Sequence, residues 1–156
     1  MAKRQTRKPG DIFKIDLKDG KCAFGRVLEN PLYAFYDLQA EITPDLDHIL
    51  SRPILFKVWV MKYAITKNIW EVIGHLPLES NLEISPRFFK QDDISKKLSI
   101  YHDGKETPAS IRECEGLECA AVWDPRHVED RLRDHFAGRK NKWVESLKIK
   151  MPPRQP

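Results

Sequence analysis

The chain has 156 residues, 41% hydrophobic and 32% charged, which is typical of a soluble globular protein and excludes a disordered or collagen-like chain. No apolar run approaches the roughly 20 residues that a membrane-spanning helix needs, so we expect no membrane association. Because Lys3, Arg4, Arg7 and Lys8 account for the entire net charge of +4, the rest of the chain is neutral, and nucleic acid, which usually selects a basic fold, is disfavoured as a partner.

The two ends of the chain are expected to lie outside the folded part. Residues 1–9 are polar and basic, and residues 149–156 are rich in proline. These patterns predict disordered tails, the first of them basic. Residues 10–148 contain no low-complexity linker, and we expect them to form a single globular domain.

The first clear elements are two strands joined by a tight turn. Residues 11–17 alternate apolar and polar side chains with a period of two. Residues 21–28 return after Asp19 and Gly20, a pair that favours a hairpin turn. Gly25 interrupts the second strand, which predicts a bulge or the close approach of another strand.

Further strands and one short helix follow. Residues 32–38 are aromatic and β-prone, and Thr43 with Pro44 predicts a short helix at residues 45–51. Residues 54–64 are apolar on both faces, as in a central strand covered on both sides, and residues 69–76 are expected to pair back on them. Gly74 is the second glycine inside a strand, and two such glycines predict a strongly curled sheet or a partly open small barrel.

The last third of the chain is expected to end in a helix that packs on this sheet. Asp124 is a suitable N-cap, Pro125 suits the first helical position, and Gly138 can end the helix. Before this helix, residues 77–91 predict a loop and residues 97–101 a short strand. Residues 108–115 predict one or two helical turns, and residues 117–122 a strand or the approach to the helix. The predicted fold class is α+β, mainly antiparallel β, with a C-terminal helix packed on the curled sheet.

The residues that could carry out catalysis or bind a metal form no recognisable local pattern. Cys114 and Cys119 are a loose pair without the second pair that structural zinc sites use. The sequence has no phosphate-binding loop, dinucleotide-binding motif or nucleophile elbow. We therefore expect no enzyme, no cofactor and no metal. An odd number of cysteines and a basic N-terminus with no apolar stretch after it disfavour a secreted disulfide protein, so we expect a cytoplasmic location.

One stretch has an uneven distribution of charge and carries the candidate binding residues. Between residues 27 and 51 there are five acids and no Lys or Arg. Acids beside aromatic rings suit a basic protein partner, because complementary charge speeds association and the rings provide contact area. An ordinary loop with a short helix would explain the same composition. The candidate partner-binding residues are Glu29, Tyr33, Tyr36, Asp37, Glu41, Asp45 and Asp47.

Several segments together resemble a known family. They are GDIF at 10–13, AFGRVL at 23–28, VWVM at 58–61, VIGHLPL at 72–78, FFKQD at 88–92, ECEGLE at 113–118, AAVWDPRHVEDRLRDHF at 120–136 and KWVESL at 142–147. Over about residues 9–148 the chain is similar to the immunity protein 26 family of bacterial polymorphic toxin systems. The resemblance implies an antitoxin that binds a cognate toxin domain in the cytoplasm, blocks its active site, needs no cofactor and catalyses nothing. We expect such a chain to be a monomer or a weak homodimer when free.

A second interpretation stays open. The segments GDIF and DGKCAFGRV also look like the first strands of small curled β-barrels, which include ribonuclease-type toxins. The chain would then be a nucleic-acid-binding or ribonuclease-like protein whose chemistry depends on Arg26, His75 and the basic tail. The neutral body argues against this interpretation.

Overall fold

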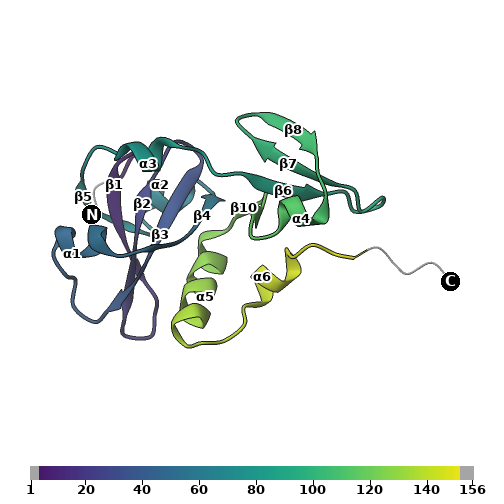
Figure 1. Ribbon diagram of the computed structural model, residues 1–156. Helices are drawn as coiled ribbons and strands as arrows, with labels where there is room; N and C mark the ends of the chain where they lie inside the picture. Colours follow the sequence, from purple (N-terminus) through teal and green to yellow (C-terminus); the bar gives the residue numbers. More distant parts are fainter. Residues whose placement is uncertain (1–3, 152–156) are drawn as a thin grey trace.

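The computed structural model describes residues 4–151 and gathers most of its strands into one mixed sheet (Figure 1). The strand order in this six-stranded sheet is β10-β4-β3-β2-β1-β5. Neighbouring strands are antiparallel, except for the parallel pair β10 and β4. The strands are β1 (Asp11–Asp16), β2 (Cys22–Val27), β3 (Leu32–Ala40), β4 (Ile54–Val60), β5 (Glu71–His75) and β10 (Val122–Trp123).

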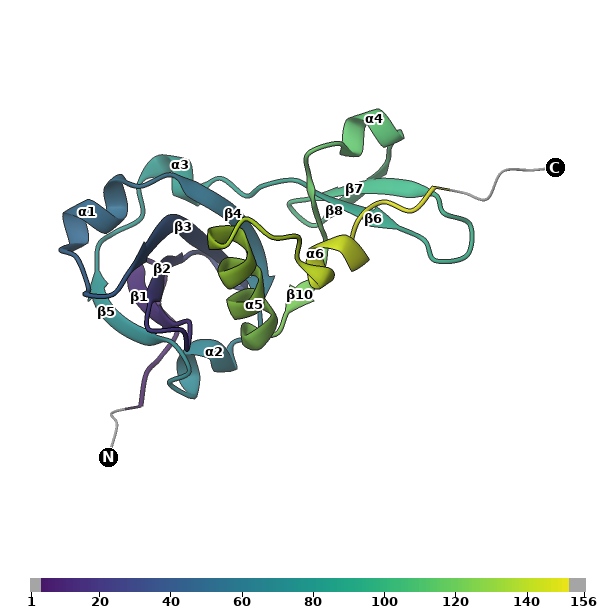
Figure 2. The same ribbon diagram turned by 90° about the horizontal axis from the view of Figure 1, so that it is seen from below.

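A smaller four-stranded sheet lies beside the first and has the order β8-β7-β6-β9. Its strands are β6 (Phe88–Gln91), β7 (Leu98–His102), β8 (Lys105–Pro108) and β9 (Glu118–Cys119). The helices are α1 (Leu46–Ser51), α2 (Tyr63–Thr66), α3 (Ser80–Glu83), α4 (Ile111–Cys114), α5 (Pro125–Phe136) and α6 (Lys142–Ser146). In both views the small sheet and α4 lie on the side of the molecule away from α1 (Figures 1 and 2).

The large sheet is buried on both faces. On one face, Val128 and Leu132 of α5 pack into the main core cluster, which also contains Trp70; Figure 2 shows α5 against this sheet. On the other face, Ile49 of α1 and Leu82 of α3 belong to two smaller clusters. Each fully buried large apolar side chain stabilises the fold by about 1.5–3 kcal/mol, so both faces of the large sheet contribute to stability.

The C-terminal helix forms where its capping residues predict it. Asp124 is the N-cap of α5 and accepts a 2.8 Å hydrogen bond from the backbone nitrogen of Arg126. Pro125 occupies the first helical turn, and Gly138 follows the helix with a φ of 70°. The N-terminal and C-terminal signals are both local in sequence, and both are confirmed.

The predictions for the two glycines inside strands are confirmed in part. At Gly25 the register of β2 against β3 shifts, and a Cβ atom there would lie 2.6 Å from the backbone oxygen of Ala34. A Cβ atom on Gly74 would lie 2.6 Å from Cδ1 of Leu46, on α1. Another part of the chain therefore approaches each glycine closely. At Gly25 the neighbour is a strand, β3, whereas at Gly74 it is the helix α1.

The predicted strongly curled sheet or partly open barrel is wrong, although the α+β class, the mostly antiparallel pairing and the C-terminal helix are confirmed. Within residues 4–151 the strands divide between two sheets, and β10 and β5 are the edges of the larger one. The two glycines accommodate close contacts without closing the sheet, and the second sheet uses strands from residues 88–119, part of which the sequence pattern predicts as a loop.

The expected pairing of residues 69–76 with residues 54–64 is also wrong. The strand β4 ends at Val60, and α2 redirects the chain before β5 begins. The strand β5 then pairs antiparallel with β1, at the far edge of the sheet from β4. A tight turn at Asn68, whose φ is 56°, is present, but the helical segment before it changes which strand β5 can reach.

Some residues outside the predicted domain, residues 10–148, contact the fold. The side chain of Gln5 donates to the backbone oxygens of Ile65 and Trp70 at 3.0 and 2.8 Å. The guanidinium of Arg7 donates to the backbone oxygen of Leu32 at 2.7 Å. Near the other end, Lys150 exchanges two hydrogen bonds with the Gln91 side chain. Residues 1–3 and 152–156, the outer parts of the two predicted tails, lie outside the described residues.

Candidate functional site

The structure buries both tyrosines of the predicted binding stretch. Tyr33 and Tyr36 are 0% and 3% exposed, because β3 is covered on both faces. The hydroxyl of Tyr33 accepts a 3.1 Å hydrogen bond from Nε of Arg7, and burial raises the pKa of Tyr33. Burial likewise raises the pKa of Tyr36, whose hydroxyl lies 3.4 Å from Arg26. These rings belong to the core and cannot anchor a partner in this conformation.

The predicted acids do not share one face. Glu29 lies just before β3, whereas Glu41 follows it and Asp47 lies on α1. These two groups are separated by the length of β3, which is about 30 Å for nine residues. The carboxylate of Asp45 is the N-cap of α1, where it accepts a 2.9 Å hydrogen bond from the backbone nitrogen of His48. Glu41, Asp45 and Asp47 are exposed and form an acidic surface around α1.

Asp37 is partly satisfied within the fold. Its Oδ1 atom lies 3.2 Å from Nε2 of His135 on α5, and its backbone oxygen accepts a hydrogen bond from Nε of Arg52 at 3.2 Å. His135 is therefore an exposed partner of Asp37. A carboxylate with a histidine at hydrogen-bond distance is a weaker attractor for a basic partner than a free one.

Glu29 joins an aromatic cleft between the two sheets, which we call the inter-sheet cleft. The cleft has a volume of about 420 Å³. Its walls come from the turn between β2 and β3, from β4, β6, β7 and β10, and from the turn between β7 and β8. The residues that line it are Glu29, Asn30, Pro31, Leu32, Trp59, Ser85, Pro86, Phe88, Tyr101, Asp103, Gly104 and Val122.

Three aromatic rings, of which Trp59 contacts the other two, form the inner wall of the inter-sheet cleft. The ring centroid of Trp59 lies 4.6 Å from that of Phe88 and 5.5 Å from that of Tyr101, which it meets edge to face. Phe88 is buried, whereas Trp59 and Tyr101 are only partly buried. Sequence reasoning missed Trp59 as a site residue, because residues 54–64 are apolar on both faces and predict a strand covered on both sides.

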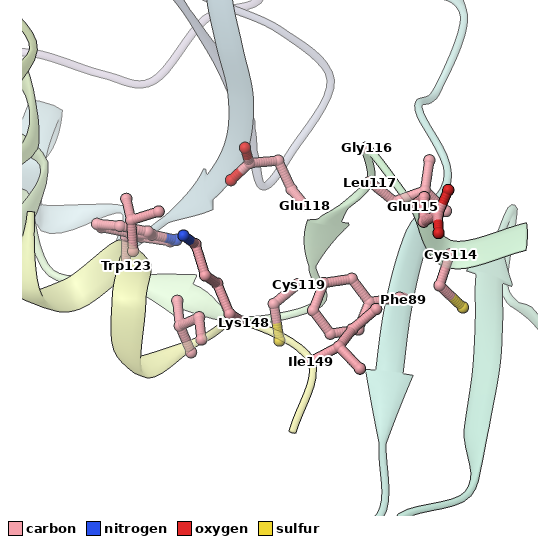
Figure 3. Close-up of a pocket in the computed structure, with 12 residues that line it drawn as sticks. Phe89, Cys114, Glu115, Gly116, Leu117, Glu118, Cys119, Trp123, Lys148 and Ile149 are labelled. Carbon is pink, nitrogen blue, oxygen red and sulfur yellow. The ribbon is translucent and has the colours of Figure 1, made fainter. Parts of the chain in front are cut away.

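A second cavity, of about 430 Å³, lies where the small sheet meets α6 (Figure 3). Figure 3 shows Trp123 and Lys148 on one side of it and Phe89 and Ile149 on another. The indole nitrogen of Trp123 is shut off from solvent and has no hydrogen-bond partner among the described residues. Because this nitrogen is covered by neighbouring side chains, a ligand in the cavity would reach it only after those side chains moved.

The residues of the ribonuclease-like interpretation serve the fold. Arg26 is 0% exposed, and its guanidinium donates to the backbone oxygens of Gly10 and Leu76 at 2.9 and 2.7 Å. His75 is an exposed member of an edge strand, and its Nδ1 atom lies 2.7 Å from Oδ1 of Asp11. Arg26 is fully enclosed and cannot reach a phosphate group outside the protein.

The cysteines are not poised for chemistry. Burial raises the pKa of the Cys22, Cys114 and Cys119 thiols, which disfavours the reactive thiolate. Across residues 4–151 no three His, Cys, Asp or Glu side chains are grouped so that they could hold a metal ion. In the same range, no helix has the length and apolar character to cross a bilayer.

Comparison with known families places the chain among the immunity proteins of polymorphic toxin systems. The model of the family described as Immunity protein 26 matches residues 8–100, which is more than half of the sequence. The chain therefore belongs to the immunity protein 26 family, whose members neutralise toxins without catalysing a reaction. No curated protein and no solved structure matches the chain. The family match includes Glu29 and Trp59 of the inter-sheet cleft, and ends before Tyr101 and Asp103.

Proposed function

We propose that the chain neutralises its cognate toxin domain by stoichiometric occlusion and that the inter-sheet cleft is the centre of the contact. The observation that carries this choice of surface is the combination of Trp59 and Tyr101, both partly buried, with the exposed carboxylates of Glu29 and Asp103. Aromatic residues are enriched at the centres of protein interfaces, and polar groups form their rims.

The surroundings of the inter-sheet cleft offer further apolar contact area. Val122, which lines the cleft, is 54% exposed, and Ile84, which directly precedes the lining residue Ser85, is 68% exposed. A standard interface needs about 800 Å² on each partner. The cleft with this apolar margin gives a toxin domain both a recess to fill and a surface to cover.

The acidic surface around α1 is a second candidate contact. Glu41, Asp45 and Asp47 are exposed, and a basic cleft in a toxin would be attracted to them. Asp37 is less suited, since His135 already contacts its carboxylate. Of the five acids between residues 27 and 51, Glu29 alone lines the inter-sheet cleft.

We place the complex in the cytoplasm of the producing cell and expect the free chain to be a monomer or a weak homodimer. The test uses the cognate toxin domain. Co-expression should restore growth of cells that make the toxin domain, and the two purified proteins should elute together at a one-to-one ratio in size-exclusion chromatography with light scattering. Separate elution and unrelieved toxicity would refute the proposal.

A further inference from the structure

The inter-sheet cleft has a negative rim and no Lys or Arg among the residues that line it. Among its lining residues there are two acids, Glu29 and Asp103, and no Lys or Arg. Within residues 4–151 no basic group lies within ion-pair distance of the Glu29 carboxylate. The Oδ2 atom of Asp103 lies 3.5 Å from Nε2 of His102, which is charged only when protonated. The cleft therefore presents two carboxylates that the fold leaves largely uncompensated.

The aromatic wall between these carboxylates includes Trp59, the ring best suited to bind a cation, and no cation lies over that ring within the described residues. Lys142 lies over the ring of Trp143 at 4.6 Å, and Arg131 lies over that of Trp123 at 5.2 Å. In the cleft wall itself, Lys90 lies over the ring of Tyr101 at 4.9 Å and is paired with Glu106. The partly exposed ring of Trp59 has no such neighbour in the part of the chain that is described. Tryptophan offers the most favourable aromatic face for a cation.

We infer that the inter-sheet cleft binds an arginine side chain of the toxin domain, an inference that rests on the proposed function. The guanidinium would lie against Trp59, with Glu29 and Asp103 accepting its hydrogen bonds. Arginine suits this site better than lysine, because its planar group stacks on aromatic rings, is weakly hydrated and carries five donors that can reach two separate carboxylates. A volume of about 420 Å³ lies within the range of about 300–1,000 Å³ that ligand pockets span.

The first experiment measures binding of the toxin domain to near-isosteric neutral variants. The double variant E29Q/D103N removes both rim charges, and asparagine tolerates the positive φ of 49° at position 103. We expect its dissociation constant to rise about tenfold or more. The matched control D93N/E115Q makes the same charge change at exposed positions outside the cleft and should stay within about twofold. If E29Q/D103N also stays within about twofold while the wild type binds, the arginine inference is overturned and the proposed function stands.

The second experiment needs no toxin, so it distinguishes a failure of the arginine inference from a failure of the proposed function. N-acetyl-arginine amide is titrated into the isotope-labelled protein, and the indole signal of Trp59, assigned with W59F, is followed by NMR together with the amide signal of Gly104. Both signals should shift, and the neutral isostere N-acetyl-citrulline amide should leave them in place. Equal shifts with both compounds, or none, would overturn the inference. If the wild type fails to bind the toxin domain, the proposed function fails, and this titration still decides whether the cleft selects a guanidinium.

Discussion

The indole nitrogen of Trp70 donates a 3.1 Å hydrogen bond to Oε2 of Glu129, a carboxylate that α5 carries into the core. Glu129 is only 3% exposed, and its other oxygen lies 3.5 Å from Nζ of Lys18. A buried carboxylate is tolerated only when it is paired and hydrogen-bonded. Trp70 and Lys18 together meet this condition, so they connect the segment before β5 and the turn after β1 to the C-terminal helix.

Trp70 and Trp123 form a matched pair for measuring this bond. Both indoles are buried, but only that of Trp70 has a hydrogen-bond partner among the described residues. We expect W70F to lower the free energy of unfolding by about 1.5–3 kcal/mol more than W123F, because a hydrogen bond to a charged group has that value. Urea unfolding of both variants measures the difference. Equal losses would show that the bond to Glu129 contributes nothing.

Arg26 is predicted to be the least replaceable charged residue. Its guanidinium is enclosed and donates to Gly10, Leu76 and Pro77 backbone oxygens and to Glu79. The variant R26M leaves these acceptors without their donor, and we expect it to cost about 3 kcal/mol or more. The control E79Q should cost less than about 1 kcal/mol, since Glu79 is about half exposed. A thermal or urea unfolding curve of R26M close to that of the wild type would contradict this account.

The elements that the sequence predicts correctly depend on local signals. The first hairpin follows from alternation and from Asp19 with Gly20, and α5 follows from its capping residue Asp124. The strand that pairs with β5 cannot be predicted from such signals, because it depends on the direction in which α2 turns the chain. The sequence also does not show which acid of α5 is buried in the core and which acids lie on the surface. Glu129 lies in the sequence among acids and bases of mixed sign, and its partners Trp70 and Lys18 lie far from it along the chain.

The candidate site could be predicted only in fragments. The charge distribution predicts Glu29 as a site residue, but it also predicts Tyr33 and Tyr36, which are buried. Aromatic residues in a strand do not indicate which face of the sheet they occupy. The structure buries them since α5 covers one side of β3 and the smaller clusters cover the other. The inter-sheet cleft brings together residues 29–32, 59 and 101–104. No pattern in the sequence indicates that the two sheets meet at these segments.

The two strand glycines should respond differently to a methyl group. In G25A the new Cβ would meet the backbone of Ala34 and the Phe13 ring, neither of which can move freely in the core. In G74A it would meet the end of the flexible Leu46 side chain. We expect G25A to cost about 1–3 kcal/mol through overpacking, and G74A to cost clearly less. Unfolding curves measure both, and an equal or larger loss in G74A would contradict the assignment of Gly25 as a core contact.

The contact between the Tyr63 hydroxyl and Asp124 predicts a pH dependence. The hydrogen bond that the Tyr63 hydroxyl donates to Asp124 lowers the pKa of Asp124 and raises the pKa of Tyr63. The stabilisation is therefore complete between the unfolded pKa values of about 4 for Asp and 10 for Tyr. It is lost as the pH falls through the lowered pKa of Asp124, or rises through the raised pKa of Tyr63. Y63F should cost about 1 kcal/mol at pH 7 and progressively less toward either extreme. A cost independent of pH would refute the coupling.

Charge reversal separates the two candidate contact surfaces. The variant E29K/D103K reverses the rim of the inter-sheet cleft, and E41K/D47K makes the same change in net charge beside α1 while leaving the Asp45 cap intact. For a basic partner at the cleft, E29K/D103K should slow association with the toxin domain about tenfold or more at low salt. Because exposed charges are screened over about 8 Å at physiological ionic strength, the slowing should shrink as salt is added. E41K/D47K should change the rate far less, since long-range attraction is its only effect. Stopped-flow mixing or surface plasmon resonance measures both, and the reverse ranking would move the contact to α1 and exclude the cleft.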